Sequence, residues 1–276
     1  MLSRMQPELE DFYEDILGKS MRGLGLDPKS LQEQSGLSQS AIEQALQGHY
    51  EEDTANTLAP ILGLHPKALR EAGKKSWKPA PISLAGLAQC NTPFGDMRVN
   101  AYVLWDVESK EAILFDTGAE ATPLLAILQQ HQLKPRYLLI THAHADHVAA
   151  LDEVRKAFPQ ITVVAPPQSG IDAAESCPEG WRFQIGSLHG EALHTPGHSA
   201  DGTTFVVQGL EHPVAVVGDA VFAGSMGGAP NAWKSALAVN REKIFTLPPE
   251  TILCPGHGPM TTVAEESQHN PFYATA

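Results

Sequence analysis

The pattern of hydrophobic and polar positions changes once along the chain. Up to about residue 75, apolar residues recur three or four positions apart, as they do on one face of a helix, and no run has the character of a strand. From Ile82 onward, short apolar runs of strand length are separated by turns rich in Gly, Pro, Asn and Asp. The pattern predicts an all-α domain over residues 1–75, a linker over 76–81 and an α/β domain over 82–276.

The N-terminal part contains several predicted helices. Its apolar stripes are Phe12-Ile16-Leu17-Met21, Ala41-Ile42-Ala45-Leu46 and Ala55-Leu58-Ala59-Leu62, and a short helix runs through Leu69. Residues 30–35 lead through the tight Gly36-Leu37 turn to Ser38, an N-cap type of residue. Helix, tight turn and helix form the helix-turn-helix arrangement. The segment from Lys29 to Leu69 resembles the phage-repressor type of this domain.

The charges of this region argue against DNA binding. Residues 1–76 hold twelve Asp or Glu and eight Lys or Arg, and no Lys or Arg lies between Lys29 and Lys67. Lys and Arg contacts to phosphate supply nearly all non-specific DNA affinity. An acidic recognition helix would therefore be repelled by the DNA phosphates. A helical bundle of this size needs further packing to be stable. We therefore expect this domain to support a homodimer or to form a wall of the active site.

The second part alternates strands with helices. Strands are expected at 82–87, 99–105, 112–115, 137–140 and 161–165, with a turn at 91–96 between the first two, and helices at 124–133 and 148–158. This alternation predicts the α/β class, with chemistry where strands end and loops begin.

Composition and charge exclude several classes of protein. Hydrophobic residues make up 42% of the 276 residues, which predicts a sizeable core, and the formal net charge of −13 argues against binding to nucleic acid or an anionic membrane surface. Residues 1–12 lack the apolar core of a signal peptide, and no run of about 18 apolar residues occurs. We expect a cytoplasmic protein with no membrane association and with reduced thiols at Cys90, Cys177 and Cys254.

A dense group of metal-ligand residue types follows the apolar run 138–140. His142 and His144 are two positions apart, so that in extended backbone their rings point to one side. Asp146 and His147 are adjacent and diverge toward a second position. The alternative is a solvated histidine-rich loop or histidines buried with ordinary hydrogen bonds, but the spacing at a strand end favours metal binding.

Further ligand types follow later apolar or strand-like segments. His198, Asp219 and His257 each lie among Gly and Pro residues that form tight loops. The other seven histidines, at positions 49, 65, 131, 189, 194, 212 and 269, have no such context. We expect those seven to be surface or core residues.

The order of these motifs resembles the metallo-β-lactamase superfamily over roughly residues 80–273. The motifs are Phe115-Asp116-Thr117-Gly118, the run from His142 to His147, Thr195-Pro196-Gly197-His198-Ser199, Gly218-Asp219 and Pro255-Gly256-His257-Gly258-Pro259. Within the superfamily, residues 218–225 and Asn270-Pro271-Phe272 are most similar to the short hydroxyacylglutathione hydrolases, which are glyoxalase II-like. The resemblance implies a four-layered αβ/βα sandwich with the metals at one edge of the sheets.

The resemblance also implies a dinuclear hydrolase. It assigns His142, His144 and His198 to one metal, Asp146, His147 and His257 to the other, and Asp219 to a bridge between them. The two ions would be Zn²⁺, with Fe or Mn²⁺ as alternatives, and a hydroxide shared by them would attack a small anionic acyl-thioester. Asp146 and Asp219 are the implied catalytic residues, with Asp146 orienting the hydroxide. The resemblance further implies that Asp116 hydrogen-bonds a ligand histidine. An aspartic-protease role would instead need a second Asp-Thr-Gly triplet, which the sequence lacks.

The sequence departs from the resembled enzymes at two places that bear on the substrate, and two alternative functions remain open. Gly228 stands where similar enzymes usually carry an arginine, and the chain ends soon after Phe272, without the glutathione-binding extension of the larger glyoxalase II enzymes. One alternative is a persulfide dioxygenase with a single iron on His142, His198 and Asp219. The other is a regulator whose metal domain senses a metabolite for a DNA- or protein-binding N-terminal domain.

Overall fold

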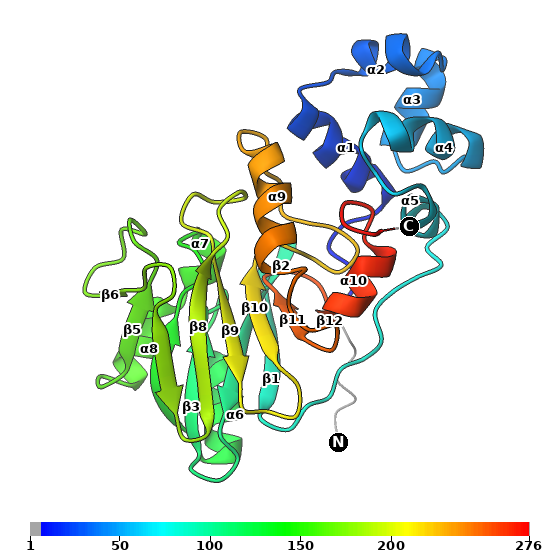
Figure 1. Cartoon of the computed structure of the whole chain (residues 1–276). Coiled ribbons are helices and arrows are strands. Elements are labelled where there is room, and N and C mark those ends of the chain that lie inside the picture. Colours follow the sequence, from blue (N-terminus) through cyan, green and yellow to red (C-terminus); the bar gives the residue numbers. More distant parts are fainter. Residues whose placement is uncertain (1–6, 276) are drawn as a thin grey trace.

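The computed structural model describes residues 7–275, so residues 1–6 of the predicted N-terminal domain and of the segment inspected for a signal peptide lie outside the described residues. The chain begins with a group of helices (Figure 1). These are α1 (Tyr13–Leu24), α2 (Pro28–Ser35), α3 (Gln39–Leu46), α4 (Glu52–Ile61) and α5 (Pro66–Gly73). Asp27 accepts from the backbone N–H of Ser30 and Ser38 accepts from that of Ala41, so both side chains cap helices as N-cap residues do.

The first of two sheets follows these helices. Its strands lie in the order β1 (Leu87–Phe94), β2 (Met97–Trp105), β3 (Glu111–Phe115), β4 (Lys134–Leu139), β5 (Thr162–Ala165) and β6 (Glu175–Ser176). Strands β3 to β6 are parallel, and β1 and β2 form an antiparallel hairpin at the edge. The connecting helices are α6 (Thr122–His131), α7 (Ala145–Val148) and α8 (Leu151–Ala157).

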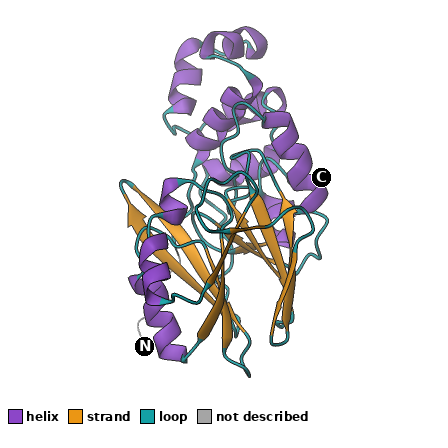
Figure 2. Ribbon diagram, turned by 90° about the vertical axis from the view of Figure 1, so that its left-hand side faces the viewer, coloured by secondary structure: helices purple, strands orange, loops and turns teal. Residues whose placement is uncertain are grey.

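The second sheet is built from the C-terminal half. Its strands lie in the order β12 (Thr261–Thr262), β11 (Ile252–Pro255), β10 (Val214–Gly218), β9 (Thr203–Gln208), β8 (Leu188–His194) and β7 (Arg182–Ile185). Helices α9 (Trp233–Lys243) and α10 (Val263–His269) complete this half. The two sheets face each other, with helices outside them (Figure 2). The predicted α/β fold class with two sheets and an N-terminal helical region is confirmed.

Three clusters of buried apolar side chains hold the layers together. Phe115 and Phe205 belong to a cluster between the two sheets, and Leu114 and Leu128 to one between the first sheet and its helices. A third cluster is continuous from α1 to α5, across the outer face of the second sheet, to α9 and α10. Trp233 of α9 lies against α1, where a Cβ on Gly23 would come within 2.0 Å of the indole. The N-terminal helices therefore bury their apolar faces partly against the rest of the chain.

One expected strand was wrong. Residues 82–86 form a loop rather than a strand, and β1 runs instead over Leu87–Phe94, through most of the expected turn. The loop ends in a turn in which Leu87 N–H donates to the Leu84 carbonyl and Gly86 has a φ of +88°. Pro93 is tolerated within β1 because this strand lies at the edge of its sheet and needs no second ladder of hydrogen bonds.

The remaining expected elements are present with shifted ends. Strands at 99–105, 112–115, 137–140 and 161–165 and the helix at 124–133 correspond to β2, β3, β4, β5 and α6. The helix expected at 148–158 is two helices, α7 and α8, and α7 contains Asp146 and His147. None of the helices described over residues 7–275 is long and apolar enough to cross a membrane.

Candidate metal centre

Seven side chains of the predicted ligand types converge at one end of the two sheets. His142 and His144 follow β4, while Asp146 and His147 lie in α7 directly after them. The other three follow strands of the second sheet: His198 follows β8, Asp219 follows β10 and His257 follows β11. Both sheets thus direct their ligand loops to the same place, although the residues are up to 115 positions apart in the sequence.

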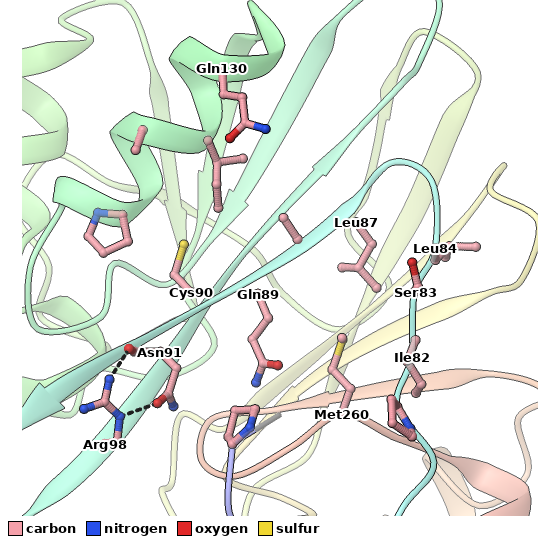
Figure 3. A pocket seen from close by; sticks show the side chains of 16 residues that line it. Ile82, Ser83, Leu84, Leu87, Gln89, Cys90, Asn91, Arg98, Gln130 and Met260 are labelled. Carbon is pink, nitrogen blue, oxygen red and sulfur yellow. Dashed lines mark hydrogen bonds between the residues drawn. The ribbon is translucent and has the colours of Figure 1, made fainter. Parts of the chain in front are cut away.

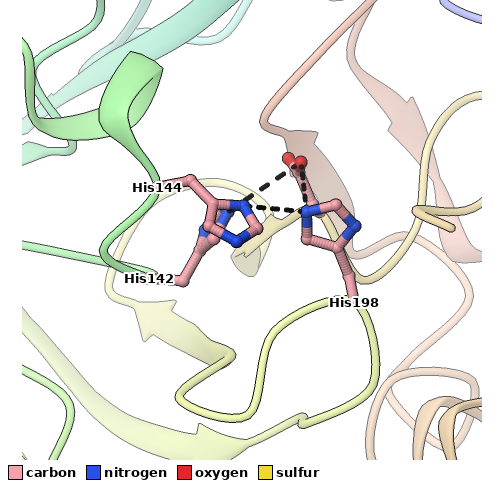
Figure 4. Close-up of side chains that lie close together, drawn as sticks. His142, His144 and His198 are labelled. Atoms are coloured by element: carbon pink, nitrogen blue, oxygen red, sulfur yellow. Dashed lines mark hydrogen bonds and ion pairs between the residues drawn. The ribbon is translucent and has the colours of Figure 1, made fainter. Parts of the chain in front are cut away.

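The first group consists of His142, His144, His198 and Asp219, whose donor atoms all lie within 4.8 Å of one another. Nδ1 of His144 is 3.1 Å from Nε2 of His142 and 3.0 Å from Nε2 of His198. An Asp219 oxygen, Oδ2, is 3.2 Å from Nε2 of His198 and 3.9 Å from Nε2 of His142 (Figure 4). Three ring nitrogens and a carboxylate oxygen therefore surround one point.

The second group consists of Asp146, His147 and His257, again with donor atoms within 4.8 Å. Nε2 of His257 is 3.3 Å and Nε2 of His147 is 3.6 Å from Oδ2 of Asp146. Asp219 also reaches this group, since Oδ1 is 3.3 Å from Nε2 of His147 and Oδ2 is 3.5 Å from Nε2 of His257. The Asp219 carboxylate therefore lies between the two groups.

Contacts behind the rings fix the orientation of the histidines. Nδ1 of His147 is 2.8 Å from Asp116, Nδ1 of His257 is 2.7 Å from the Arg98 carbonyl, and Nδ1 of His198 is 3.1 Å from the Gly228 carbonyl. In each case the acceptor holds the proton on Nδ1, which leaves Nε2 free to bind a metal. The hydrogen bond expected between Asp116 and a ligand histidine is present.

Several contacts that support the site were not predicted. Asp201 accepts a hydrogen bond from the backbone N–H of Ala143, 3.0 Å away, and the side chain of Ser199 donates to the same carboxylate, which ties the loop of His198 to that of His142. Glu10 places Oε2 4.0 Å from Nδ1 of His257. Gly256 is required sterically, because a Cβ there would lie 2.1 Å from Oδ1 of Asp219. Contacts across so many residues leave no local signal in a sequence.

The electrostatics of the cluster divide it into neutral and charged rings. Burial and the neighbouring His147 lower the pKa of His142 to about 2, so that this ring is neutral. Burial alone would lower the pKa of His147 and His257 as well, but the carboxylates beside them raise these pKa values to about 10 and about 11. Burial would raise the pKa of Asp219, yet His147 and His257 hold it well below its usual value. Cations are thus favoured beside Asp219.

The residues present fit divalent metal ions. Oδ1 of Asp219 and Nε2 of His147 are both buried and make no hydrogen bond, although they face each other. Buried polar atoms without a partner are costly, so a pair of them marks a place where a partner is expected. Neutral imidazole and carboxylate donors suit Zn²⁺, Fe and Mn²⁺. A metal ion would satisfy both atoms and replace the protons that hold the cluster together.

A separate cavity of about 880 Å³ lies along β1, between α6 and the loop 81–84 (Figure 3). Cys90, Gln89 and Met260 line it, and no candidate ligand does. Arg98 at its end is engaged, because its guanidinium donates to the side chain and carbonyl of Asn91. The cavity therefore lies apart from the convergent ligands.

The comparisons with known proteins all point to one superfamily. Residues 94–171 match the metallo-beta-lactamase superfamily. The chain is 30% identical to the probable metallo-hydrolase YqgX of Bacillus subtilis, over 65% of this chain and 94% of that protein. It is 29% identical to the hydroxyacylglutathione hydrolase GloC of Haemophilus influenzae, over 65% and 95%, and 32% identical to the human mitochondrial persulfide dioxygenase ETHE1, over 62% and 69%.

A solved structure supports the same relationship. The crystal structure of the BLEG-1 B3 metallo-beta-lactamase superposes with a TM-score of 0.58 at 32% identity, covering 68% of this chain and all of that one. With the fold, the convergent side chains and these relatives together, the chain belongs to the metallo-beta-lactamase superfamily. Its two groups of His and Asp side chains could each hold a metal ion. About a third of the chain lies outside these matches.

Proposed function

We propose that the protein is a dinuclear metal-dependent hydrolase that cleaves a small acyl-thioester of the hydroxyacylglutathione type. The observation that carries this proposal is the position of Asp219, whose carboxylate lies 3.2 Å from His198 in the first group and 3.3 Å from His147 in the second. In the proposal, His142, His144 and His198 hold one ion, Asp146, His147 and His257 hold the other, and Asp219 bridges them. The hydroxyacylglutathione hydrolase among the relatives supports the substrate class.

The chemistry follows from the residues that surround the two positions. Two divalent ions, about 3.5–4 Å apart in such sites, would lower the pKa of a shared water to about 7 and would polarise a carbonyl. Asp146, whose side chain is 13% exposed, is partly open to solvent and is proposed to orient the attacking oxygen and to accept its proton. His144 is exposed and His198 partly so, which gives the substrate access from the side of the first group. The thiolate of the substrate then leaves.

Hydrolysis of a hydroxyacylglutathione thioester by the metal-loaded protein tests the proposal. We expect turnover that is lost when a chelator removes the metals and returns with added Zn²⁺, Fe²⁺ or Mn²⁺. Asp219→Ala should be the most damaging single change, with a loss of at least about 100-fold, because two cations would then face each other without the bridge. Asp152→Ala, on the exposed face of α8, is the matched control. Full activity of Asp219→Ala would overturn the proposed mechanism.

A persulfide dioxygenase is the second candidate. Its support is the 32% identity to the human enzyme and the presence of His142, His198 and Asp219 together in the first group. In this reaction one iron and molecular oxygen would oxidise a glutathione persulfide. Oxygen consumption with that substrate, together with no thioester turnover, would favour this candidate over the hydrolase.

For the N-terminal region we propose a role in the site rather than on DNA. The proposed helix-turn-helix-like domain, residues 1–75, is joined through a linker at 76–81 to the proposed catalytic domain, 82–276. The backbone around Glu10 packs against the loop of His257, where a Cβ on Gly258 would come 3.2 Å from the Glu10 nitrogen. The excess of acidic residues disfavours phosphate contact. A gel-shift at two salt concentrations tests DNA binding, and sedimentation tests whether the region also supports a homodimer.

A further inference from the structure

Three consecutive residues, Met226, Gly227 and Gly228, form a backbone strip beside the first ligand group. Gly228 accepts from Nδ1 of His198 at 3.1 Å, and Gly227 N–H donates to the carbonyl of Asp219 at 3.1 Å. The strip therefore contacts two of the four residues of the first group directly. Any displacement of its backbone would move the ring of His198 relative to Asp219.

The strip has few side-chain contacts of its own to hold it. Two of its three residues are glycines, which restrict the backbone least. Gly227 cannot be replaced by a larger residue, since a Cβ there would lie 2.0 Å from the Asp219 carbonyl and 3.0 Å from the His198 ring. A Cβ on Gly228 would meet nothing within 4 Å. The position of the strip thus depends on Met226, whose side chain is buried, and on the groups that bind its backbone.

Lys19 binds that backbone from the N-terminal helices. This residue of α1 donates from Nζ to the Met226 carbonyl at 2.8 Å and forms an ion pair with Asp11. Its ammonium also lies 5.0 Å from the centre of the Phe222 ring, in the same loop as the strip. The side chains of Lys19 and Asp11 are only 13% and 8% exposed. With these partners, Lys19 is engaged by the protein and is not a free cation for a substrate.

We infer that Lys19 is a positioning residue for the first metal position, acting through Met226, Gly227 and Gly228 on His198 and Asp219. The inference rests on the proposed dinuclear site. It assigns to helix α1 a part in holding the metal, across 207 positions of sequence. Residues that orient ligands from behind typically change metal affinity about 10–100-fold when they are replaced.

Zinc binding to the metal-free protein tests the inference. Competition with a chromophoric chelator yields two stepwise dissociation constants, and His198→Ala identifies which of them belongs to the first group. The key variant is Asp11→Asn/Lys19→Met, which removes both charges and so leaves no buried charge unpaired. We expect the dissociation constant of the first group to weaken about tenfold, because the strip contacts both His198 and Asp219 of that group. The constant of the second group should weaken less, because Asp219 is the one residue contacted by the strip that also lies beside the second group.

Three further variants separate positioning from general stability. Lys29→Met removes a lysine from the exposed surface of α2 and should leave both constants unchanged. Lys19→Arg keeps a charged donor and should restore most of the zinc affinity. Asp11→Asn breaks the ion pair but leaves the bond from Lys19 to Met226, so it should bind zinc like the wild type.

Two outcomes would overturn the inference. One is a folded double variant with wild-type zinc constants, and the other is an Asp11→Asn variant that weakens zinc as much as the double variant does. Thermal unfolding of the same samples shows which variants are folded. A wild-type protein that binds fewer than two zinc ions would instead count against the dinuclear site itself.

Discussion

Nδ1 of His147 lies 2.8 Å from Oδ2 of Asp116, and the two side chains are 0% and 4% exposed. The same Oδ2 accepts from the hydroxyl of Thr141, and Oδ1 accepts from the Thr141 backbone N–H. One carboxylate therefore fixes both the ring of His147 and the start of the loop that carries His142. Asp116 does this from a left-handed conformation with a φ of +54°.

Asp116→Asn should weaken metal binding by about 10–100-fold. Asn adopts left-handed backbone readily, so the loop should be preserved. Its one oxygen cannot accept from both His147 and the Thr141 backbone N–H, so one of these donors would face the amide N–H groups. Metal content per chain after dialysis, measured by elemental analysis, checks this. Asp172→Asn, on the exposed surface, serves as the control. Wild-type metal content in Asp116→Asn would show that the carboxylate does not support His147.

The buried carboxyl of Glu266 should make stability depend on pH. Burial raises its pKa from 4.5 to about 7, against hydrogen bonds from Asn270, Thr261 and Gly224 that favour the ionised form. Because the folded pKa is above the unfolded one, the carboxyl contributes stability fully below about pH 4.5. That contribution is lost as pH rises toward 7, and it amounts to ~3 kcal/mol.

Glu266→Gln tests this dependence, since a glutamine can keep the contacts of the protonated carboxyl. Chemical denaturation of both proteins between pH 5 and pH 8 gives the free energy of unfolding. We expect the wild type to lose stability relative to the variant as pH rises, with the difference levelling off above pH 7. Parallel curves for the two proteins would contradict a raised pKa at this position.

Gly228→Arg should lower KM for an anionic thioester. The side chain has open space, and the carbonyl that binds His198 is retained. A guanidinium beside the first group would add an attraction of about 1 kcal/mol, which corresponds to about a fivefold lower KM. Gly228→Gln, with a long neutral side chain, is the matched control. Equal KM values for the Arg and Gln variants would show that position 228 does not contact the negative charge of the substrate.

The sequence predicted the parts of this molecule that have a local signal. An apolar run ending in His142, His144, Asp146 and His147 predicts a strand that delivers side chains to an edge, and β4 does so. The expected strand at 82–87 was wrong because an apolar run between prolines has the composition of a strand but a turn ends it at Gly86. The alternation of apolar residues alone does not distinguish a strand from a loop of the same composition.

Other features could not be predicted from the sequence for physical reasons. The carbonyls of Arg98 and Gly228 that orient His257 and His198 belong to backbone, which every residue type possesses. The contact between Lys19 and Met226 depends on how α1 packs against the second half of the chain, and no periodicity records it. The helical stripes of residues 12–62 predicted which faces are buried, but not that α9 would pack against α1.

The most direct test of the central claim is the rate of thioester hydrolysis by metal-free protein to which metal is returned in known amounts. We expect activity to rise until two equivalents per chain have been added and then to stay level, with no need for oxygen, because the proposed site places Asp219 between two groups of side chains that could each hold an ion. A rate that reaches its maximum at one equivalent, or no turnover of thioester at any loading, would contradict it.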